Sequence, residues 1–283
     1  MYTFAVQNRY GEKLELTHNP AYSISEIDGI DPPDADINTT RNAGADGSLF
    51  NSAYMNNRTI TITLAINAPA EANRIELYRY FKSRFPVRIF YKNDTRDVYI
   101  DGYVQSMQIQ FFAKKQTAQI VVQCPNPLFN GSLNNVQEFS EVQALFEFPF
   151  SIEDEGIPFS EVLDYVEALI FNNGDVDTGA IITIKASGGA VVNPKIYNVD
   201  TSEYFNLNLS MSDGDEVTIN TRRGEKSVKL LSDGVQSNIV GAMVEGSTWF
   251  LLKPSANTFT IVADSGQENM QVTFSIIDQY EGV

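Results

Sequence analysis

Cysteine and histidine are almost absent from this chain of 283 residues, which holds one of each, Cys124 and His18. A single cysteine excludes an internal disulfide, and one of each excludes a zinc cluster built from cysteine and histidine ligands. A catalytic site that needs two histidines is excluded as well. The low cysteine content is typical of proteins that assemble in a reducing cytoplasm.

Basic residues are also scarce, with 20 Lys and Arg against 36 Asp and Glu, so the formal net charge is −16. Proteins that bind nucleic acid neutralise its phosphates with clustered Lys and Arg, whereas this balance has the opposite sign. Stable nucleic-acid binding is therefore excluded, and anionic membrane surfaces are disfavoured. No apolar run approaches the ~20 residues that span a bilayer, and the first residues lack the pattern of a secretory signal. We expect a soluble protein without a membrane address.

The excess acid is confined to the second half of the chain. Residues 1–131 hold 13 basic and 13 acidic side chains, whereas residues 132–283 hold 7 basic and 23 acidic ones. Residues 132–177 contain eleven acidic residues and no Lys or Arg. Just before this step, two prolines and an Asn-Gly pair in residues 124–132 end any regular strand. Together these features predict a domain boundary between roughly residues 130 and 170, with the first folded unit ending at residues 124–132.

The first half has the pattern of a β unit with one helix. Residues 59–66 alternate between Thr and aliphatic side chains, which predicts a half-buried strand. Between Pro69 and Pro86, residues 70–85 show helical spacing, which predicts an amphipathic helix. The apolar face expected for this helix consists of Ile75, Tyr78, Phe81 and Phe85. Further strands are expected at 87–91, 98–112 and 118–124.

The second half reads as short strands separated by turn signals, with no helical pattern between them. This spacing predicts an antiparallel sandwich or jelly roll. The expected strands are 181–186, 196–199, 204–209, 217–220, 227–231, 248–252, 259–263 and 271–277.

Two features superficially suggest chemistry. Residues 41–48 (RNAGADGS) look like a phosphate-cradling loop, but they lack the Gly-Lys-Ser/Thr ending and the strand–loop–helix context. A flexible loop that contacts a neighbouring molecule is the favoured interpretation. His18 is a candidate general base, yet it lies in a His-Asn-Pro turn, and the chain has no Gly-x-Ser-x-Gly motif. We expect a surface histidine.

Three further features have a structural and a functional interpretation. The adjacent acids Glu153–Glu155 invite a glycosidase hypothesis, but neighbours on a linker cannot be held across a cleft, so a solvated connector is favoured. Residues 213–216 (DGDE) offer oxygens to calcium without the twelve-residue loop pattern, so a turn is favoured and weak calcium binding stays open. Trp249 suits either sugar stacking or a strand core, and the core is favoured.

The order of motifs along the chain resembles the distal tail proteins of phages with siphovirus-type tails that infect Gram-positive bacteria. In the first half the resemblance is carried by residues 27–33 (IDGIDPP), 46–48 (DGS), 57–62 (NRTITI), the helix at 70–85 and 124–129 (CPNPLF). In the second half it is carried by residues 172–175 (NNGD), 193–196 (NPKI), 214–219 (GDEVTI), 249–252 (WFLL) and 280–283 (YEGV).

The resemblance implies a mainly β fold. Residues 1–132 would form a tail-tube-related, sandwich or barrel-like domain with one α-helix, which builds the ring. Residues 133–170 would form an acidic connector, and residues 171–283 a jelly-roll sandwich of galectin-like or carbohydrate-binding-module-like type. It also implies a homohexameric ring in the virion, at the tail tip or baseplate, assembled in the host bacterial cytoplasm.

The partners implied are the major tail tube protein and the tail-associated hub protein, with receptor-binding proteins docked peripherally in some phages. The resemblance implies no enzyme activity and no cofactor, and it supplies no catalytic, cofactor-binding or metal-binding residues. The alternative function is a carbohydrate-binding module of a phage or prophage particle that recognises host surface glycans. A cell-wall hydrolase has the least support, because no paired carboxylate site can be named.

Overall fold

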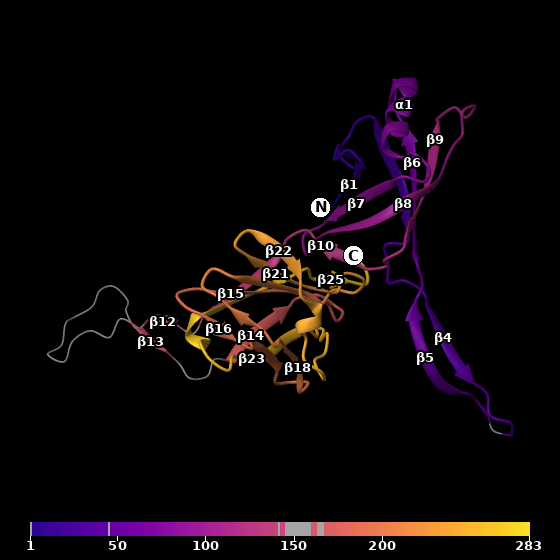
Figure 1. Cartoon of the computed structure of the whole chain (residues 1–283). Helices are drawn as coiled ribbons and strands as arrows, with labels where there is room; N and C mark the ends of the chain where they lie inside the picture. The colour runs from indigo at the N-terminus through magenta and orange to yellow at the C-terminus, as the bar shows by residue number, and fades with distance from the viewer. Residues whose placement is uncertain (1, 45, 141, 145–159, 163–166) are drawn as a thin grey trace, which may run out of the picture. The chain divides into compact units, whose positions relative to one another are not determined.

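The computed structural model describes residues 2–44, 46–140, 142–144, 160–162 and 167–283 (Figure 1). The chain forms two compact units, and each has its own hydrophobic core. Unit 1 comprises residues 1–133 together with the last five residues, 279–283, and unit 2 comprises residues 134–278. The chain therefore leaves unit 1 once and returns to it at its end.

Unit 1 is built on one curved antiparallel sheet with the strand order β2-β1-β7-β8-β9-β6-β3, to which β10 and β25 are added beside β8. The two ends of this order, β2 and β3, are edge strands. The strands are β1 (Thr3–Asn8), β2 (Lys13–Glu15), β3 (Tyr22–Asp28), β6 (Arg58–Ile66), β7 (Pro86–Lys92), β8 (Asp97–Ile109), β9 (Thr117–Cys124), β10 (Phe129–Gly131) and β25 (Gln279–Tyr280). A separate hairpin, formed by β4 (Ala35–Thr40) and β5 (Leu49–Met55), leaves the sheet between β3 and β6.

The alternating segment at residues 59–66 is β6, as predicted, and its aliphatic face forms the centre of the unit 1 core. Ile60, Ile62 and Leu64 are fully buried. The intervening Thr side chains face outward on the same strand, and Thr59 bonds to Gln123 on β9. The predicted strands 87–91, 98–112 and 118–124 are confirmed as β7, β8 and β9.

The helix predicted at 70–85 is shorter than expected and is turned differently. α1 spans Ala70–Tyr80, and the chain then turns so that Pro86 begins β7. Leu77 and Phe81 face the core, whereas Ile75 and Tyr78 are exposed. The predicted apolar face was therefore wrong at these two positions, because the helix buries only a narrow stripe.

A buried arginine on β6 ties together three distant segments of unit 1. The Arg58 guanidinium is buried and donates hydrogen bonds to the carbonyl oxygens of Gly29 (2.7 Å), Asp31 (2.6 Å), Pro127 (2.6 Å) and Glu281. Its carbon lies 4.6 Å from the ring centroid of Phe129. Burial lowers the pKa of this guanidinium.

The chain's last residues are fixed to unit 1 by strand pairing and by a second arginine. β25 pairs with β10, and the Arg96 guanidinium lies 4.3 Å from the Tyr280 ring centroid and donates to the carbonyl of Gly282. The Val283 N–H also donates to the carbonyl of Ile30. The strand by which the chain leaves unit 1, β10, is thus paired with the strand by which it returns, β25.

Unit 2 is a sandwich of two antiparallel sheets. The larger has the order β11-β24-β15-β20-β21-β22 and the smaller β14-β23-β17-β18, with the pair β16-β19 beside them. The strands are β11 (Asn135–Ser140), β14 (Glu167–Asn172), β15 (Ala180–Ala186), β16 (Val191–Val192), β17 (Lys195–Asn198), β18 (Glu203–Asn206), β19 (Ser210–Met211), β20 (Glu216–Asn220), β21 (Ser227–Ser232), β22 (Val235–Asn238), β23 (Ser255–Val262) and β24 (Met270–Ile276). Two 3₁₀ turns, Val240–Ala242 and Gln267–Asn269, and the short pair β12 (Val142–Ala144) and β13 (Ser160–Val162) complete the elements.

The core of unit 2 lies between the two sheets. Phe274 from the larger sheet packs on Phe259 from the smaller, with ring centroids 5.2 Å apart, and both are fully buried. The mainly β fold class is confirmed, and the predicted strands between 181 and 277 are present with one exception. Residues 248–252 form no strand; only an isolated bridge joins Leu252 to Thr178.

The boundaries of the units differ from the predicted ranges at two places. β11 and the start of β14 lie inside the range predicted as an acidic connector, yet both pair with strands of unit 2 along their full lengths. Residues 279–283, predicted as part of the jelly roll, belong to unit 1. The predicted ranges were based on the change in net charge near residue 130. Net charge depends on composition and carries no information on strand pairing, so β11 and the start of β14 were assigned to the connector.

Replacement of Arg58 by Met is expected to destabilise unit 1 strongly. The substitution leaves four carbonyls without their donor, and bonds to a charged group contribute about 1.5–3 kcal/mol each, so we expect a loss of at least ~3 kcal/mol. Urea unfolding followed by circular dichroism measures this loss. The only tryptophan, Trp249, lies in unit 2, so its emission follows unit 2 separately.

The matched control is Arg79→Met, which removes an exposed ion pair with Glu12 and is expected to cost about 0–1 kcal/mol. Equal losses for the two variants would contradict the structural role given to Arg58.

The Cys124 thiol is expected to be unreactive in the folded protein. The residue is fully buried, and burial raises the pKa of the thiol to about 12. Because the folded pKa lies above the unfolded value, the stabilisation by the protonated thiol is present below about pH 9 and is lost as the pH rises towards 12. A chromogenic disulfide reagent at pH 8 should label Cys124 only in urea, and rapid labelling of the native chain would contradict this burial.

Candidate functional site

A two-stranded hairpin projects from unit 1 and is exposed along its whole length. β4 and β5 pair only with each other, with a bulge between Asn38 and Thr39. Every residue of both strands is exposed. Figure 1 shows the hairpin extending away from the sheet of unit 1. Polar contacts between the strands, including Asn38 to Ser52 and Asn51 to Thr40, hold the hairpin together.

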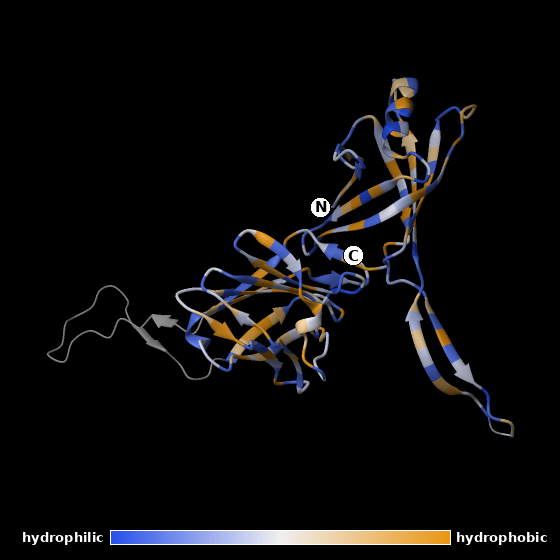
Figure 2. Ribbon diagram, viewed as in Figure 1, coloured by the Kyte–Doolittle hydropathy of each residue, from blue (hydrophilic) through white to orange (hydrophobic). Residues whose placement is uncertain are grey.

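The hairpin carries large apolar side chains that make no core. Phe50 is 67% exposed and Ile37 is 65% exposed. Apolar and polar residues alternate in colour along both strands in Figure 2. The other large apolar residues exposed on the hairpin are Leu49, Tyr54 and Met55. An isolated two-stranded hairpin is marginally stable in water, so this arrangement points to a protein partner that covers it.

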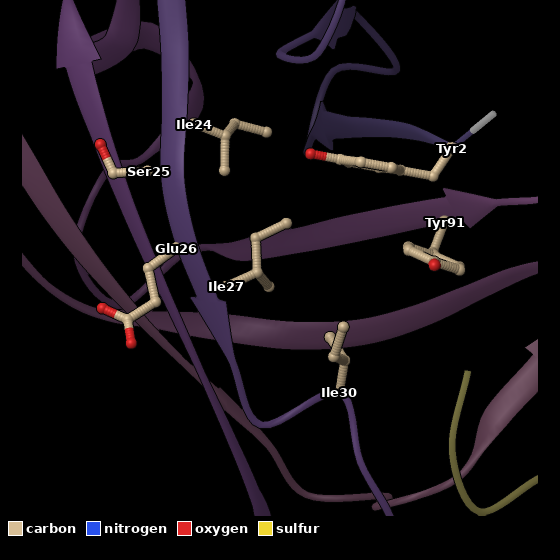
Figure 3. A pocket seen from close by; sticks show the side chains of 7 residues that line it. All are labelled: Tyr2, Ile24, Ser25, Glu26, Ile27, Ile30 and Tyr91. Carbon is tan, nitrogen blue, oxygen red and sulfur yellow. The ribbon is translucent and has the colours of Figure 1, made fainter.

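A second feature of unit 1 is an open apolar pocket of about 250 Å³ between the edge strand β3 and the start of β1 (Figure 3). The rings of Tyr2 and Tyr91 are stacked with centroids 6.4 Å apart and form one wall. Ile27 and Ile30, half-buried against the unit 1 core, face them across the pocket. The remaining lining residues are Ile24, Ser25 and Glu26.

The pocket follows from the topology of the sheet. β3 pairs with β6 on one side only, so its other edge is open, and consecutive residues of β3 line the pocket. Gly29 turns the chain at the end of β3 with a φ of 84°, and a Cβ there would lie 2.0 Å from the Thr59 carbonyl oxygen. The turn brings Ile30 back to the pocket. Open strand edges and apolar hollows are features of protein-binding surfaces.

A third feature is the exposed tip between β8 and β9, beside α1. Phe112 is 104% exposed, the highest exposure among the large apolar residues. Its neighbour Phe111 packs under the Arg74 guanidinium, whose carbon lies 5.0 Å from the ring centroid. Lys114 and Lys115 follow in the same turn.

The structure does not bring together the residues that the sequence offered as candidates for catalysis or ligand binding. The loop at residues 41–48 is the tip of the β4–β5 hairpin, which confirms that it lacks a strand–loop–helix context. His18 is exposed in a bend after β2. The acids Glu153–Glu155 lie outside the described residues. Neither the loop nor His18 lines the pocket at β3.

The acids of residues 213–216 serve a turn, as favoured. The Asp213 carboxylate accepts the Gly188 N–H at 2.8 Å, and the Asp215 carboxylate accepts the Ser212 N–H at 2.8 Å. Within the described ranges, no three His, Cys, Asp or Glu residues are placed to hold a metal ion. Trp249 is half-buried and meets buried Phe205 edge to face at 5.2 Å, in agreement with the core interpretation.

Among the described residues, no helix is long and apolar enough to cross a membrane; α1 is far too short and polar. The predicted strands 98–112 and 118–124 placed the turn that forms the tip, and residues 41–48 were predicted as a loop that contacts a neighbouring molecule, whereas the hairpin strands and the pocket were not predicted. The hairpin strands have no buried face, so their apolar residues do not alternate in the way that predicts a strand. The pocket residues come from three separate segments, and no spacing in the sequence links them.

Each unit matches a family model of phage tail proteins. A family model described as a phage tail protein RIFT-related domain matches residues 10–124, and one described as the C-terminal domain of a siphovirus-type tail component matches residues 173–276. Together they cover more than half of the chain. No curated protein sequence matches the chain.

Solved structures share the fold at low sequence identity. The Dit (gp 19.1) protein of phage SPP1, described as a paradigm of the hub adsorption apparatus in phages that infect Gram-positive bacteria, has a TM-score of 0.66 at 14% identity. That match covers 97% of this chain and 98% of the other. A chain of the phage P2 baseplate in its activated conformation has a TM-score of 0.55 at 8% identity with full coverage of both chains, in the calcium form and in the strontium form.

The family models correspond to the two units in the order that the sequence motifs indicated, and the mainly β architecture agrees with them. The family is a structural component of phage tails and baseplates. The chain belongs to the family of siphovirus-type distal tail proteins.

Proposed function

We propose that this chain assembles into a homohexameric ring that joins the tail tube to the adsorption apparatus at the tail tip or baseplate. The ring would be built in the cytoplasm of the host and would function in the virion. Its partners would be the major tail tube protein on one side and the tail-associated hub protein on the other, with receptor-binding proteins at the periphery. The role is structural rather than enzymatic.

The observation that carries this proposal is the β4–β5 hairpin. It buries none of its large apolar side chains within its own chain, and its outer strand edges pair with no other strand of the described chain. Covering such a surface with another copy removes apolar area from water and supplies strand or side-chain partners. A contact between unlike surfaces of identical copies closes into a ring when the rotation between copies is a simple fraction of a turn.

The charge distribution also favours unit 1 as the ring-forming part. Residues 1–131 carry equal numbers of basic and acidic side chains, so six copies can approach without net repulsion. The excess acid lies after residue 131, and salt screens repulsion between exposed charges beyond about 8–10 Å. Unit 2, a sandwich with its own core, would be displayed by the ring and would dock other tail proteins.

No observation favours the carbohydrate-binding alternative at Trp249, the aromatic residue that suggested it. Its ring packs edge to face with Phe205, and the Lys226 ammonium lies 5.8 Å from its ring centroid. A sugar that stacked on this ring would have to compete with these contacts.

Shortening the hairpin is expected to abolish assembly without unfolding unit 1. In the variant, residues 37–53 are replaced by Asn-Gly, a two-residue turn that joins the paired residues Asp36 and Tyr54. Sedimentation velocity should show a large shift from hexamer to monomer. Circular dichroism should be nearly unchanged, because the removed residues are exposed.

The matched control is Asn51→Ala, which removes one polar contact to Thr40 and keeps the apolar surface of the hairpin. It should sediment as the native chain does. A shortened chain that still forms hexamers would overturn the role of the hairpin.

A further inference from the structure

The tip between β8 and β9 is built to present one aromatic side chain. Phe111 is held on α1 by the Arg74 guanidinium, while Phe112 next to it is fully exposed. β8 and β9 are paired without a register shift from Ser106 and Val121 up to Ile109 and Ala118, so the tip stands on a continuous ladder. A fully exposed phenylalanine on a braced turn is a feature of an anchor that another surface buries.

The pocket at β3 has the size and lining to receive a phenyl ring. Its volume is about 250 Å³, and an apolar cavity of about 150 Å³ is enough to hold benzene. The stacked rings of Tyr2 and Tyr91 on one side and Ile27 and Ile30 on the other offer aromatic and aliphatic contacts to such a ring (Figure 3).

The tip of a chain does not reach the pocket of the same chain. β6 separates β9 from β3, the strand that lines the pocket, and the packing of Phe111 on α1 holds the tip at the helix. In Figure 1 the tip of β8 and β9 and the N-terminus, which precedes Tyr2, lie at opposite sides of unit 1. The ring that enters the pocket must come from a second copy.

Charge distinguishes the tip from the hairpin as the occupant. Glu26 is exposed at the pocket rim, and the tip carries Lys114 and Lys115 with no acidic residue between Phe111 and Thr117. The hairpin region, residues 34–55, carries three acidic residues, Asp34, Asp36 and Asp46, against one basic residue, Arg41, so its approach to Glu26 would bring mainly like charges together. Opposite charges at the rim favour the tip and fix its direction of entry.

We propose that Phe112 of one copy inserts into the pocket formed by Tyr2, Ile27, Ile30 and Tyr91 of the neighbouring copy, with Lys114 or Lys115 facing Glu26. The contact is heterologous, since tip and pocket are different surfaces, and it can therefore repeat around a closed ring. This inference rests on the proposed ring and adds a second contact to the one made by the hairpin.

The test measures self-association of the full-length chain by sedimentation velocity over a concentration series. Phe112→Ala should weaken assembly at least tenfold, whereas Phe112→Leu, which keeps an apolar side chain, should weaken it only a few fold. Circular dichroism should be unchanged for both, because the Phe112 side chain is fully exposed.

Charge reversal tests the pairing independently of Phe112. Glu26→Lys alone, and Lys114→Glu with Lys115→Glu, should each weaken assembly several fold, and the three substitutions together should restore it. These effects should shrink at high salt, because the charges lie at an exposed rim.

The outcomes separate this contact from the proposed function. Native-like assembly of Phe112→Ala would overturn the tip-in-pocket contact and leave the ring standing. Failure of the combined charge reversal to restore assembly would overturn the pairing of the tip with Glu26. A native chain that stays monomeric at every concentration would contradict both the ring and this contact.

Discussion

The buried guanidinium of Arg58 is the interaction on which the organisation of unit 1 depends. It has four backbone carbonyls as partners, from Gly29, Asp31, Pro127 and Glu281. A buried charge is tolerated only when its donors are satisfied, so the three segments that supply these carbonyls must be in place together. Gly29 and Asp31 lie at the root of the β4–β5 hairpin, Pro127 lies on the exit towards unit 2, and Glu281 lies on the return. One side chain thus fixes the base of both insertions into unit 1.

The two units differ in the surfaces that they expose. Unit 1 is a sheet with one helix; many of its exposed apolar side chains lie on the hairpin and on the tip beside α1, and half-buried apolar side chains line the open edge of β3. These surfaces occur in the half of the chain where acid and base balance. Unit 2 buries Phe205, Phe250, Phe259 and Phe274 in its core and holds most of the excess acid, which suits a part that stands in solvent or meets other proteins.

The elements that the sequence predicted are those with a one-sided burial pattern. β6 alternates strictly because one face is core, and the strands of unit 2 alternate for the same reason. The hairpin residues 35–40 and 49–55 carry no such pattern, since both of their faces are exposed, so they were not predicted as strands. The period of α1 was visible, but the direction of its buried stripe depends on Leu77, which the spacing of the aromatic residues concealed. The tail tied by Arg58 and Arg96 depends on contacts across more than 180 residues, which no local pattern encodes.

The central claim is that copies of this chain close into a ring through unit 1. Negative-stain microscopy of the purified full-length chain tests it most directly, because the symmetry of class averages reads out both closure and subunit number. The account predicts rings with six-fold symmetry. A uniform population of single particles of monomer size at high protein concentration, or open filaments, would contradict it.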